Sequence, residues 1–218
     1  EEGLKLFKEL VSVADVVVDN FSQGVTQRLG IDHQSLKKVN PKIITCSISG
    51  FGDTELNRPA YDNLIQGYAG AMSITGTDKE NPVKSGIPIA DLGAGLYAVI
   101  GILSAIQSRE KNDSGEHVDI SMLDTQVSLL TYMATMHFLS GENPEPIGNQ
   151  HMNHVPFNSY RTLDGFIQIG VVAEDFWPSL IEALDLRQLD TEENKVRIGR
   201  LKNRENIDEA LQEVFITN

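Results

Sequence analysis

Short apolar runs, separated by stretches of helical periodicity, recur along this chain. The clearest run is ADVVVDN (14–20), and KIITCSIS (42–49) and HVDISM (117–122) have the same character. Strands covered by helices on both faces show this pattern, because neither face meets water. Apolar residues at helical spacing occupy the intervening sequence over 4–13, 24–39, 61–73 and 123–139. This alternation predicts an α/β fold with a doubly wound parallel sheet.

The composition changes after this alternating region. Residues 141–156 are rich in Pro, Gly and Asn, as connecting segments are. We therefore expect residues 1–140 to form part of a large α/β domain and residues 157–218 part of a smaller α+β domain. In the smaller domain we expect strands in SYRTL and FIQIGVV and helices near 174–185 and 204–215. The chain begins with Glu and stops soon after a helical run, so we expect a fragment or a processed chain.

The chain is strongly acidic, with 18 Lys and Arg against 31 Asp and Glu and a formal net charge of −13. Such a surface repels nucleic acid and anionic membranes, so neither is an expected partner. A phosphate-bearing ligand would need a locally basic pocket. No apolar stretch reaches the roughly 20 residues of a membrane span without glycine or a polar residue. The absence of a signal peptide favours a cytoplasmic location, or the mitochondrial matrix if a targeting segment is missing.

The Cys, His and Ser residues do not suggest metal, disulfide or hydrolytic chemistry. The single cysteine, Cys46, lies inside the second apolar run, where a buried structural thiol in a reducing compartment is expected. His151 and His154 are three residues apart in a loop without an obvious third ligand, so we expect no metal. The sequence has neither a Ser-His-Asp order nor a G-x-S-x-G motif.

One carboxylate is notable because its surroundings are apolar or small. In SGIPIADLGAGLYAVIGIL (85–103), the apolar run 87–90 meets Asp91, and a pattern typical of a buried helix follows. The residue pattern alone favours a helix N-cap, a role worth about 1 kcal/mol. A second interpretation is a nucleophile toward a thioester. Partial burial without a salt-bridge partner would keep such a carboxylate reactive.

A third interpretation is a dinucleotide-binding turn. Gly93, Gly95 and Ala98 formally match G-x-G-x-x-A after a strand, and Asp119 supplies an acid in the next strand. In that motif the helix N-terminus holds a pyrophosphate, and Asp91 would place a carboxylate beside it, which disfavours this interpretation. Asp124, in SMLDTQV, is expected to be a first-turn acid or cap of its helix.

Several segments together resemble the class III CoA-transferase family. This group contains formyl-CoA, carnitine and succinyl–hydroxymethylglutarate CoA-transferases, with α-methylacyl-CoA racemase as a relative. The similar segments follow the family's order over nearly the whole chain: 14–32, 40–52, 58–70, 85–106, 114–124 and 155–170. The resemblance implies a Rossmann-like large domain and an interlocked homodimer. It also implies acyl-CoA and a small carboxylic acid as substrates, with no tightly bound cofactor.

The resemblance also implies roles for individual residues. The acid that opens the glycine-dotted helix is the family's nucleophile, so this role falls on Asp91, which can cap its helix as well. Transfer would be a ping-pong reaction through an aspartyl-CoA thioester. Contacts to CoA map onto Asn20, Phe21, Arg28, Tyr61 and Asp62, and an active-site loop onto Gly148, Asn149 and Gln150.

Two sequence differences from known members help to distinguish the activities found within this group. Racemases carry a histidine as one of two bases where this chain has Tyr61, and a tyrosine with a pKa of about 10 is a poor base at neutral pH. The loop 147–151 retains one glycine where formyl-CoA transferase has a run of them. A CoA-transferase is therefore the main hypothesis. The alternatives are a racemase and a non-catalytic CoA- or nucleotide-binding fragment.

Overall fold

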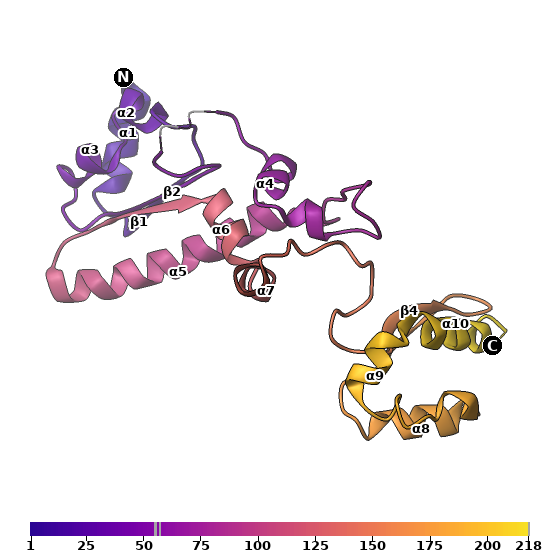
Figure 1. Cartoon of the computed structure of the whole chain (residues 1–218). Helices are drawn as coiled ribbons and strands as arrows, with labels where there is room; N and C mark the ends of the chain where they lie inside the picture. Colours follow the sequence, from indigo (N-terminus) through magenta and orange to yellow (C-terminus); the bar gives the residue numbers. More distant parts are fainter. Residues whose placement is uncertain (55, 57, 218) are drawn as a thin grey trace. The chain divides into compact units, whose positions relative to one another are not determined.

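Three parallel strands form the central sheet of the computed structural model, which describes residues 1–54, 56 and 58–217. The strands are β1 (Val16–Asp19), β2 (Ile44–Ser49) and β3 (His117–Ser121), and they pair in that order (Figure 1). Cys46 at the centre of β2 pairs with Val18 on one side and Val118 on the other. The parallel α/β sheet predicted from the apolar runs is therefore confirmed.

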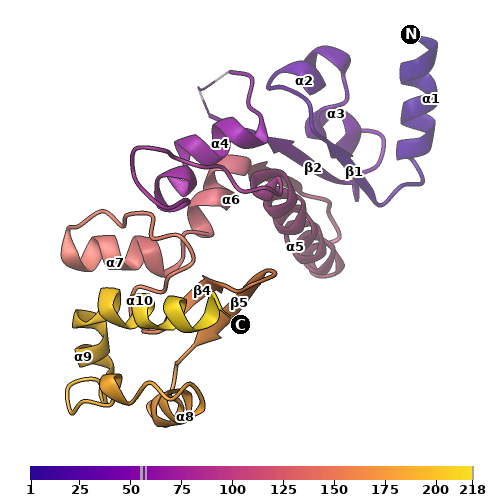
Figure 2. The same cartoon turned by 90° about the vertical axis from the view of Figure 1, so that its right-hand side faces the viewer.

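Helices cover both faces of this sheet (Figure 2). One face carries the polar side chains of β2, and His33 on α3 (His33–Lys37) contacts Thr45 there at 2.9 Å. The short helix α1 (Glu2–Val11) packs on the same side, through Val11, in a cluster with Leu36. The long helix α5 (Ile89–Asn112) packs against the opposite, apolar face. This is the layered arrangement of a doubly wound fold.

The helix α5 buries its small residues and exposes many of its large ones. Its buried residues are Ala90, Gly93, Ala94, Ala98 and Ala105. Its exposed residues include Leu92, Leu96, Val99, Ile100 and Leu103. The expectation of a buried helix is therefore only half right. By length and composition α5 is also apolar enough to cross a membrane, although glycines and Asp91 interrupt it as expected. A single such helix carries little weight, because core helices meet the same criterion.

Two glycines of α5 provide a matched test of this packing. A Cβ added at Gly101 would lie 2.6 Å from Val118 Cγ1, whereas one at Gly95 meets nothing within 4 Å. We expect Gly101→Ala to destabilise the protein by about 1–3 kcal/mol through overpacking. Gly95→Ala should stabilise it by up to about 1 kcal/mol, because alanine is the better helix former. Urea unfolding measures both, and equal effects would contradict the packing of α5 on β3.

Three helices expected as single elements are each divided in two. The expected helix 24–39 is α2 (Val25–Leu29) and α3, 61–73 is α4 (Asp62–Tyr68) and a 3₁₀ turn (Ala71–Ile74), and 123–139 is α6 (Met122–Ser128) and α7 (Tyr132–Ser140). Gly30 and Gly70 interrupt the first two with φ of 69° and 80°. At the third break Thr131 has φ of 48°. Such a conformation is uncommon for a β-branched residue, so the pattern of apolar residues does not reveal the break.

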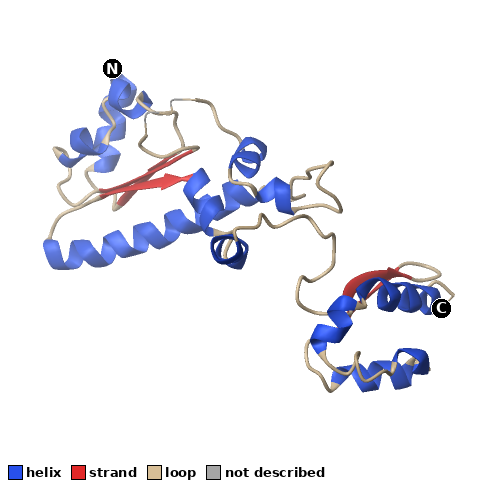
Figure 3. Cartoon of the chain, in the orientation of Figure 1, coloured by secondary structure: helices blue, strands red, loops and turns tan. Residues whose placement is uncertain are grey.

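The chain divides into two compact units, residues 1–75 with 82–145 and residues 76–81 with 146–218. The second unit contains an antiparallel hairpin of β4 (Phe157–Arg161) and β5 (Phe166–Gly170) with helices α8 (Phe176–Ala183), α9 (Arg197–Lys202) and α10 (Arg204–Phe215) (Figure 3). A short 3₁₀ turn (Arg187–Leu189) follows α8. The core gathers around Trp177, Tyr160 and Leu211. The α+β character expected of this part is confirmed, while α9 was not anticipated.

Candidate active site

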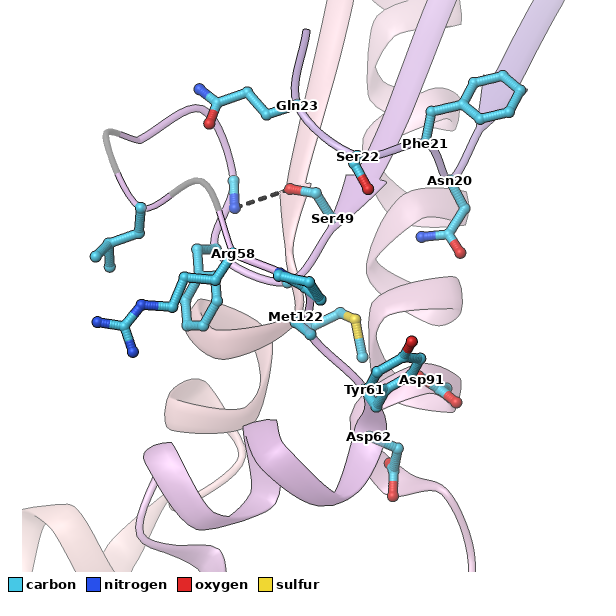
Figure 4. Close-up of a pocket in the computed structure, with 16 residues that line it drawn as sticks. Asn20, Phe21, Ser22, Gln23, Ser49, Arg58, Tyr61, Asp62, Asp91 and Met122 are labelled. Atoms are coloured by element: carbon cyan, nitrogen blue, oxygen red, sulfur yellow. Dashed lines mark hydrogen bonds between the residues drawn. The ribbon is translucent and has the colours of Figure 1, made fainter. Parts of the chain in front are cut away.

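A pocket of about 360 Å³ lies where the three parallel strands end. Asn20 and Phe21 follow β1, Ser49 and Gly50 lie at the end of β2, and Met122 comes directly after β3. Ligands of open α/β sheets bind outside the carboxyl ends of the strands, because loops there converge on one edge. Figure 4 shows this pocket, with the Gly52 N–H donating to Ser49 Oγ at 3.0 Å. The topology thus brings segments far apart in sequence to one site.

Asp91 lines this pocket from the first turn of α5. The helix begins at Ile89 with Pro88 as its N-cap residue, so Asp91 is the third helical residue and makes no capping hydrogen bond. The prediction that Asp91 caps its helix is therefore wrong. The dinucleotide motif is also lost, because the run 87–90 enters the helix and is not a strand. Among the described residues, no group donates a hydrogen bond to the Asp91 carboxylate.

Asp62 supplies the missing cap from another helix. Its Oδ1 accepts a hydrogen bond from the Ala90 N–H at 2.9 Å, and its Oδ2 accepts one from Gln66 Nε2 at 2.7 Å. Asp62 thereby satisfies one of the N–H groups that the first turn of α5 leaves without an intrahelical partner. This role was missed because the donor and acceptor are 28 residues apart and on different helices. Asp91 is therefore not needed to cap α5.

The environment of Asp91 raises the pKa of its carboxyl group above the ordinary value. Desolvation by the pocket walls is the larger cause, and the negative charge of Asp62 is the second. The side chain remains accessible to solvent, so a ligand in the pocket can reach it. A carboxylate with a raised pKa is less stabilised as an anion, and this makes it a better nucleophile than an ordinary surface aspartate.

The remaining predicted residues of this unit fall into two groups. Asn20, Phe21, Tyr61 and Asp62 line the same pocket as Asp91. Asn20 Nδ2 donates to the Ile48 carbonyl at 2.7 Å and so joins the ends of β1 and β2, while Phe21 and Tyr61 are 47% and 68% exposed. The open rings provide flat apolar surface for a ligand.

Arg28 and the predicted loop are not among the residues that line this pocket. Arg28 lies exposed in the last turn of α2. Gly148, Asn149 and Gln150 belong to the second unit. There the Gly148 N–H donates to the Gly76 carbonyl at 2.7 Å, and the side chains of Asn149 and Gln150 donate to Ser159 and Asp208. In this structure the Gly148 N–H is thus already engaged within its own unit.

Arg58 lines the pocket and was not anticipated. Figure 4 shows it on the opposite side from Tyr61, Asp62 and Asp91. Its guanidinium donates to Tyr68 Oη at 2.7 Å and lies 6.0 Å from the centre of that ring. Among the described residues that line the pocket it is the only lysine or arginine, so it supplies the local positive charge that an acidic protein needs for an anionic ligand. The sequence feature that could have indicated Arg58 as a site residue is its position three residues before Tyr61.

The other titratable groups considered in the sequence, namely Cys46, Asp124, His151 and His154, do not line this pocket. Cys46 is fully buried, as expected, and burial raises the pKa of its thiol to about 11. Asp124 is the expected first-turn acid of α6, where Ser121 is the cap. His151 and His154 lie in ring contact, with centroids 4.8 Å apart. Within the described part of the chain, no group of three or more His, Cys, Asp or Glu side chains is placed to hold a metal ion.

This geometry can be compared with known proteins. The chain matches the family described as CoA-transferase family III over residues 1–218. It is 36% identical over 204 residues to a succinate–glutarate CoA-transferase of Agrobacterium fabrum, covering 91% of this chain and 51% of the relative. It is 31% identical to human succinyl-CoA:glutarate CoA-transferase, covering 98% of this chain and 50% of the relative. The chain thus spans about half the length of these curated relatives.

A solved structure extends the comparison to three dimensions. The crystal structure of a CAIB/BAIF family protein from Brucella suis superposes with a TM-score of 0.90 at 35% identity. The match covers 100% of this chain and 58% of that chain. The resemblance found in the sequence is confirmed, and the chain belongs to CoA-transferase family III.

Proposed function

We propose that the whole protein transfers CoA between two carboxylic acids, with Asp91 as the covalent acyl acceptor. The observation that carries the proposal is the Asp91 carboxylate itself. It is free of hydrogen bonds from the described residues, has a raised pKa and lines a pocket at the carboxyl ends of the strands. Membership of the family supports the same assignment.

The first half-reaction forms an enzyme thioester. The Asp91 carboxylate attacks the carbonyl carbon of the donor acyl-CoA, an Asp91–acyl anhydride forms, and CoA leaves as a thiolate. That thiolate then attacks the Asp91 carbonyl carbon. The donor acid departs with one oxygen from Asp91, and an aspartyl-CoA thioester remains.

The second half-reaction reverses these steps with the acceptor. The acceptor carboxylate attacks the aspartyl thioester, an anhydride forms again, and the CoA thiolate is released. The thiolate attacks the acceptor's carbonyl carbon, which yields the new acyl-CoA and regenerates the Asp91 carboxylate. One oxygen of the acceptor acid stays on Asp91, so atoms and charge balance over the cycle.

The residues around Asp91 are suited to the positioning and binding that this reaction requires. Asp62 holds the first turn of α5 through the Ala90 N–H. We assign Phe21 and Arg58 to CoA, because an exposed ring and a guanidinium away from Asp91 suit the nucleotide portion of an extended thioester. The names of the two relatives above lead us to propose dicarboxylic acids such as glutarate and succinate as donors or acceptors.

The test is an exchange assay with the whole protein. Succinyl-CoA is incubated with a panel of carboxylic acids, and newly formed acyl-CoA is separated and quantified. We expect glutaryl-CoA to appear and succinate to be released in equal amounts. Absence of exchange with every acid would overturn the proposal. Incorporation of deuterium from heavy water at the α-carbon of a branched acyl-CoA would instead identify a racemase.

The pH profile of acylation should respond to Asp62. The reactive form of Asp91 is the ionised carboxylate, so the rate is lost as the pH falls through the pKa of Asp91. Asp62→Asn removes one of the two causes that raise this pKa and keeps an oxygen acceptor for the Ala90 N–H. It also loses the oxygen that accepts from Gln66 Nε2, so the readout is the position of the acidic limb and not the absolute rate. We expect the acidic limb to move to lower pH in single-turnover measurements. An unchanged limb, or one moved to higher pH, would contradict this electrostatic account.

A further inference from the structure

Gln66 is a buried amide on α4 whose two ends hold the segment that leads into α5. Its side chain is only 1% exposed. The Nε2 group donates to Asp62 Oδ2 at 2.7 Å, and Oε1 accepts from the Ser85 N–H at 2.8 Å. Both ends of this amide are therefore bonded in a buried place, where an unpaired polar group would be costly.

The side chains of Asp62 and Gln66 hold the backbone before Asp91 at two points, and we call this pair of side chains the clamp. Asp62 and Gln66 lie four residues apart on α4 and so share one face of it. Asp62 accepts a hydrogen bond from the Ala90 N–H, and Gln66 accepts one from the Ser85 N–H. These two hydrogen bonds hold the two ends of residues 85–90, the stretch that comes directly before Asp91.

Within this stretch the Ile87 N–H donates to Ser85 Oγ at 3.3 Å, but this bond lies before the helix begins. Pro88 is the N-cap residue of α5, and its side chain can accept no hydrogen bond. The start of α5, and with it the direction of the Asp91 side chain, is therefore set from α4. The amide of Gln66 fixes the carboxylate of Asp62 in the orientation that receives the Ala90 N–H.

We propose that Gln66 is a positioning residue for Asp91, acting through Asp62 and the Ser85 backbone to fix the first turn of α5. The inference rests on the proposed function, in which Asp91 accepts the acyl group. Gln66 does not line the pocket, so its loss should slow acylation while CoA binding persists. A side chain that only supported folding would weaken both together.

The test compares Gln66→Met with Gln126→Met in the whole protein. Gln126, on α6, is also buried, at 4% exposed, and its Oε1 has no hydrogen-bond partner among the described residues. Both changes bury a methionine in place of an amide, but only the first removes the clamp. The rate of acylation of Asp91 is measured by rapid quenching and intact mass, and CoA affinity by titration calorimetry.

We expect Gln66→Met to slow acylation by about 10- to 100-fold, the range that small misplacements of reacting groups produce. Its dissociation constant for CoA should stay within about threefold of the wild-type value, a difference of less than 1 kcal/mol. Gln126→Met should change neither quantity by more than about twofold, since it removes no hydrogen bond found in this structure.

Gln66→Glu adds a pH readout, which a purely structural role would move together with the affinity for CoA. The introduced carboxyl group would face Asp62 on its own helix, and Lys84 donates to the adjacent Ser85 carbonyl at 3.2 Å. When ionised it cannot donate to Asp62, but when protonated it reproduces both hydrogen bonds of the amide. The acylation rate of this variant, divided by the wild-type rate at the same pH, should therefore rise as the pH falls.

Wild-type acylation in Gln66→Met, equal losses of acylation and CoA affinity, or a pH-independent ratio for Gln66→Glu would each overturn the inference. Failure of the proposed function has a different signature, because the wild-type protein itself would then form no adduct on Asp91.

Discussion

Asp91→Ala is expected to lower the rate of CoA transfer by at least about a thousand-fold, because a covalent route has no substitute for its nucleophile. The variant should fold, since no described residue hydrogen-bonds to the Asp91 carboxylate and the N-terminus of α5 is capped by Asp62. The stability change should stay within about 1 kcal/mol, the size of a helix-dipole contribution. Affinity for CoA should persist.

Asp124→Ala is the matched control. Asp124 occupies the same third position of α6 that Asp91 occupies in α5, but it does not line the pocket. Both variants lose an acid from a first helical turn, so both lose the same interaction with the helix dipole. Only Asp91→Ala should lose transfer. Comparable activity in the two variants, measured with succinyl-CoA and glutarate, would exclude Asp91 as the nucleophile.

Gly50→Ala is expected to damage the pocket wall through a single methyl group. A Cβ added at Gly50 would lie 2.1 Å from the Ala60 Cβ, far inside van der Waals contact. Ala60 precedes Tyr61 and Asp62, so relief of this clash must move the segment that lines the pocket and caps α5. We expect a loss of about 1–3 kcal/mol in unfolding free energy, as overpacking usually costs. We also expect about tenfold weaker CoA binding, which corresponds to 1.4 kcal/mol.

The structure also supplies the rescue for Gly50→Ala. The other atoms near the added Cβ are the Ala60 Cα at 3.6 Å and Ile65 Cδ1 at 3.7 Å, which are ordinary contacts. Removing the Ala60 methyl therefore removes the clash. The double variant Gly50→Ala/Ala60→Gly should recover CoA affinity to within about threefold of the wild-type value. Additive losses in this double-mutant cycle would contradict the close approach of Gly50 and Ala60.

The sheet could be predicted because a local run of apolar residues marks each of its strands. Runs such as 14–20 and 42–49 are apolar over a strand's length, and helical segments between them leave parallel pairing as the simplest arrangement. The interruption at Thr131 could not be predicted, because the positive φ of 48° at this residue has no signal in the pattern of apolar residues. The outward face of α5 was misjudged for a related reason: the apolar pattern of a helix does not show that its small residues form the buried face and its large ones the exposed face.

The candidate site was predictable as a set of residues and not as a set of contacts. Resemblance placed Asp91, Tyr61 and Asp62 together, and the structure gathers them in one pocket. Which acid caps α5 depends on a hydrogen bond between two helices, so the local rule assigned the cap to Asp91 and was wrong. The role of Gln66 was missed for the same reason, because its partner Ser85 becomes a neighbour only when α4 packs against the start of α5.

The central claim is that Asp91 becomes covalently bonded during transfer, and an isotope experiment tests it most directly. The whole protein is turned over with succinyl-CoA and glutarate that carries a heavy oxygen isotope in its carboxylates, then digested and mapped by mass spectrometry. The mechanism predicts that one heavy oxygen enters the Asp91 side chain for each acceptor acid consumed in the first turnover. An unlabelled Asp91 in protein that has completed turnover would contradict it.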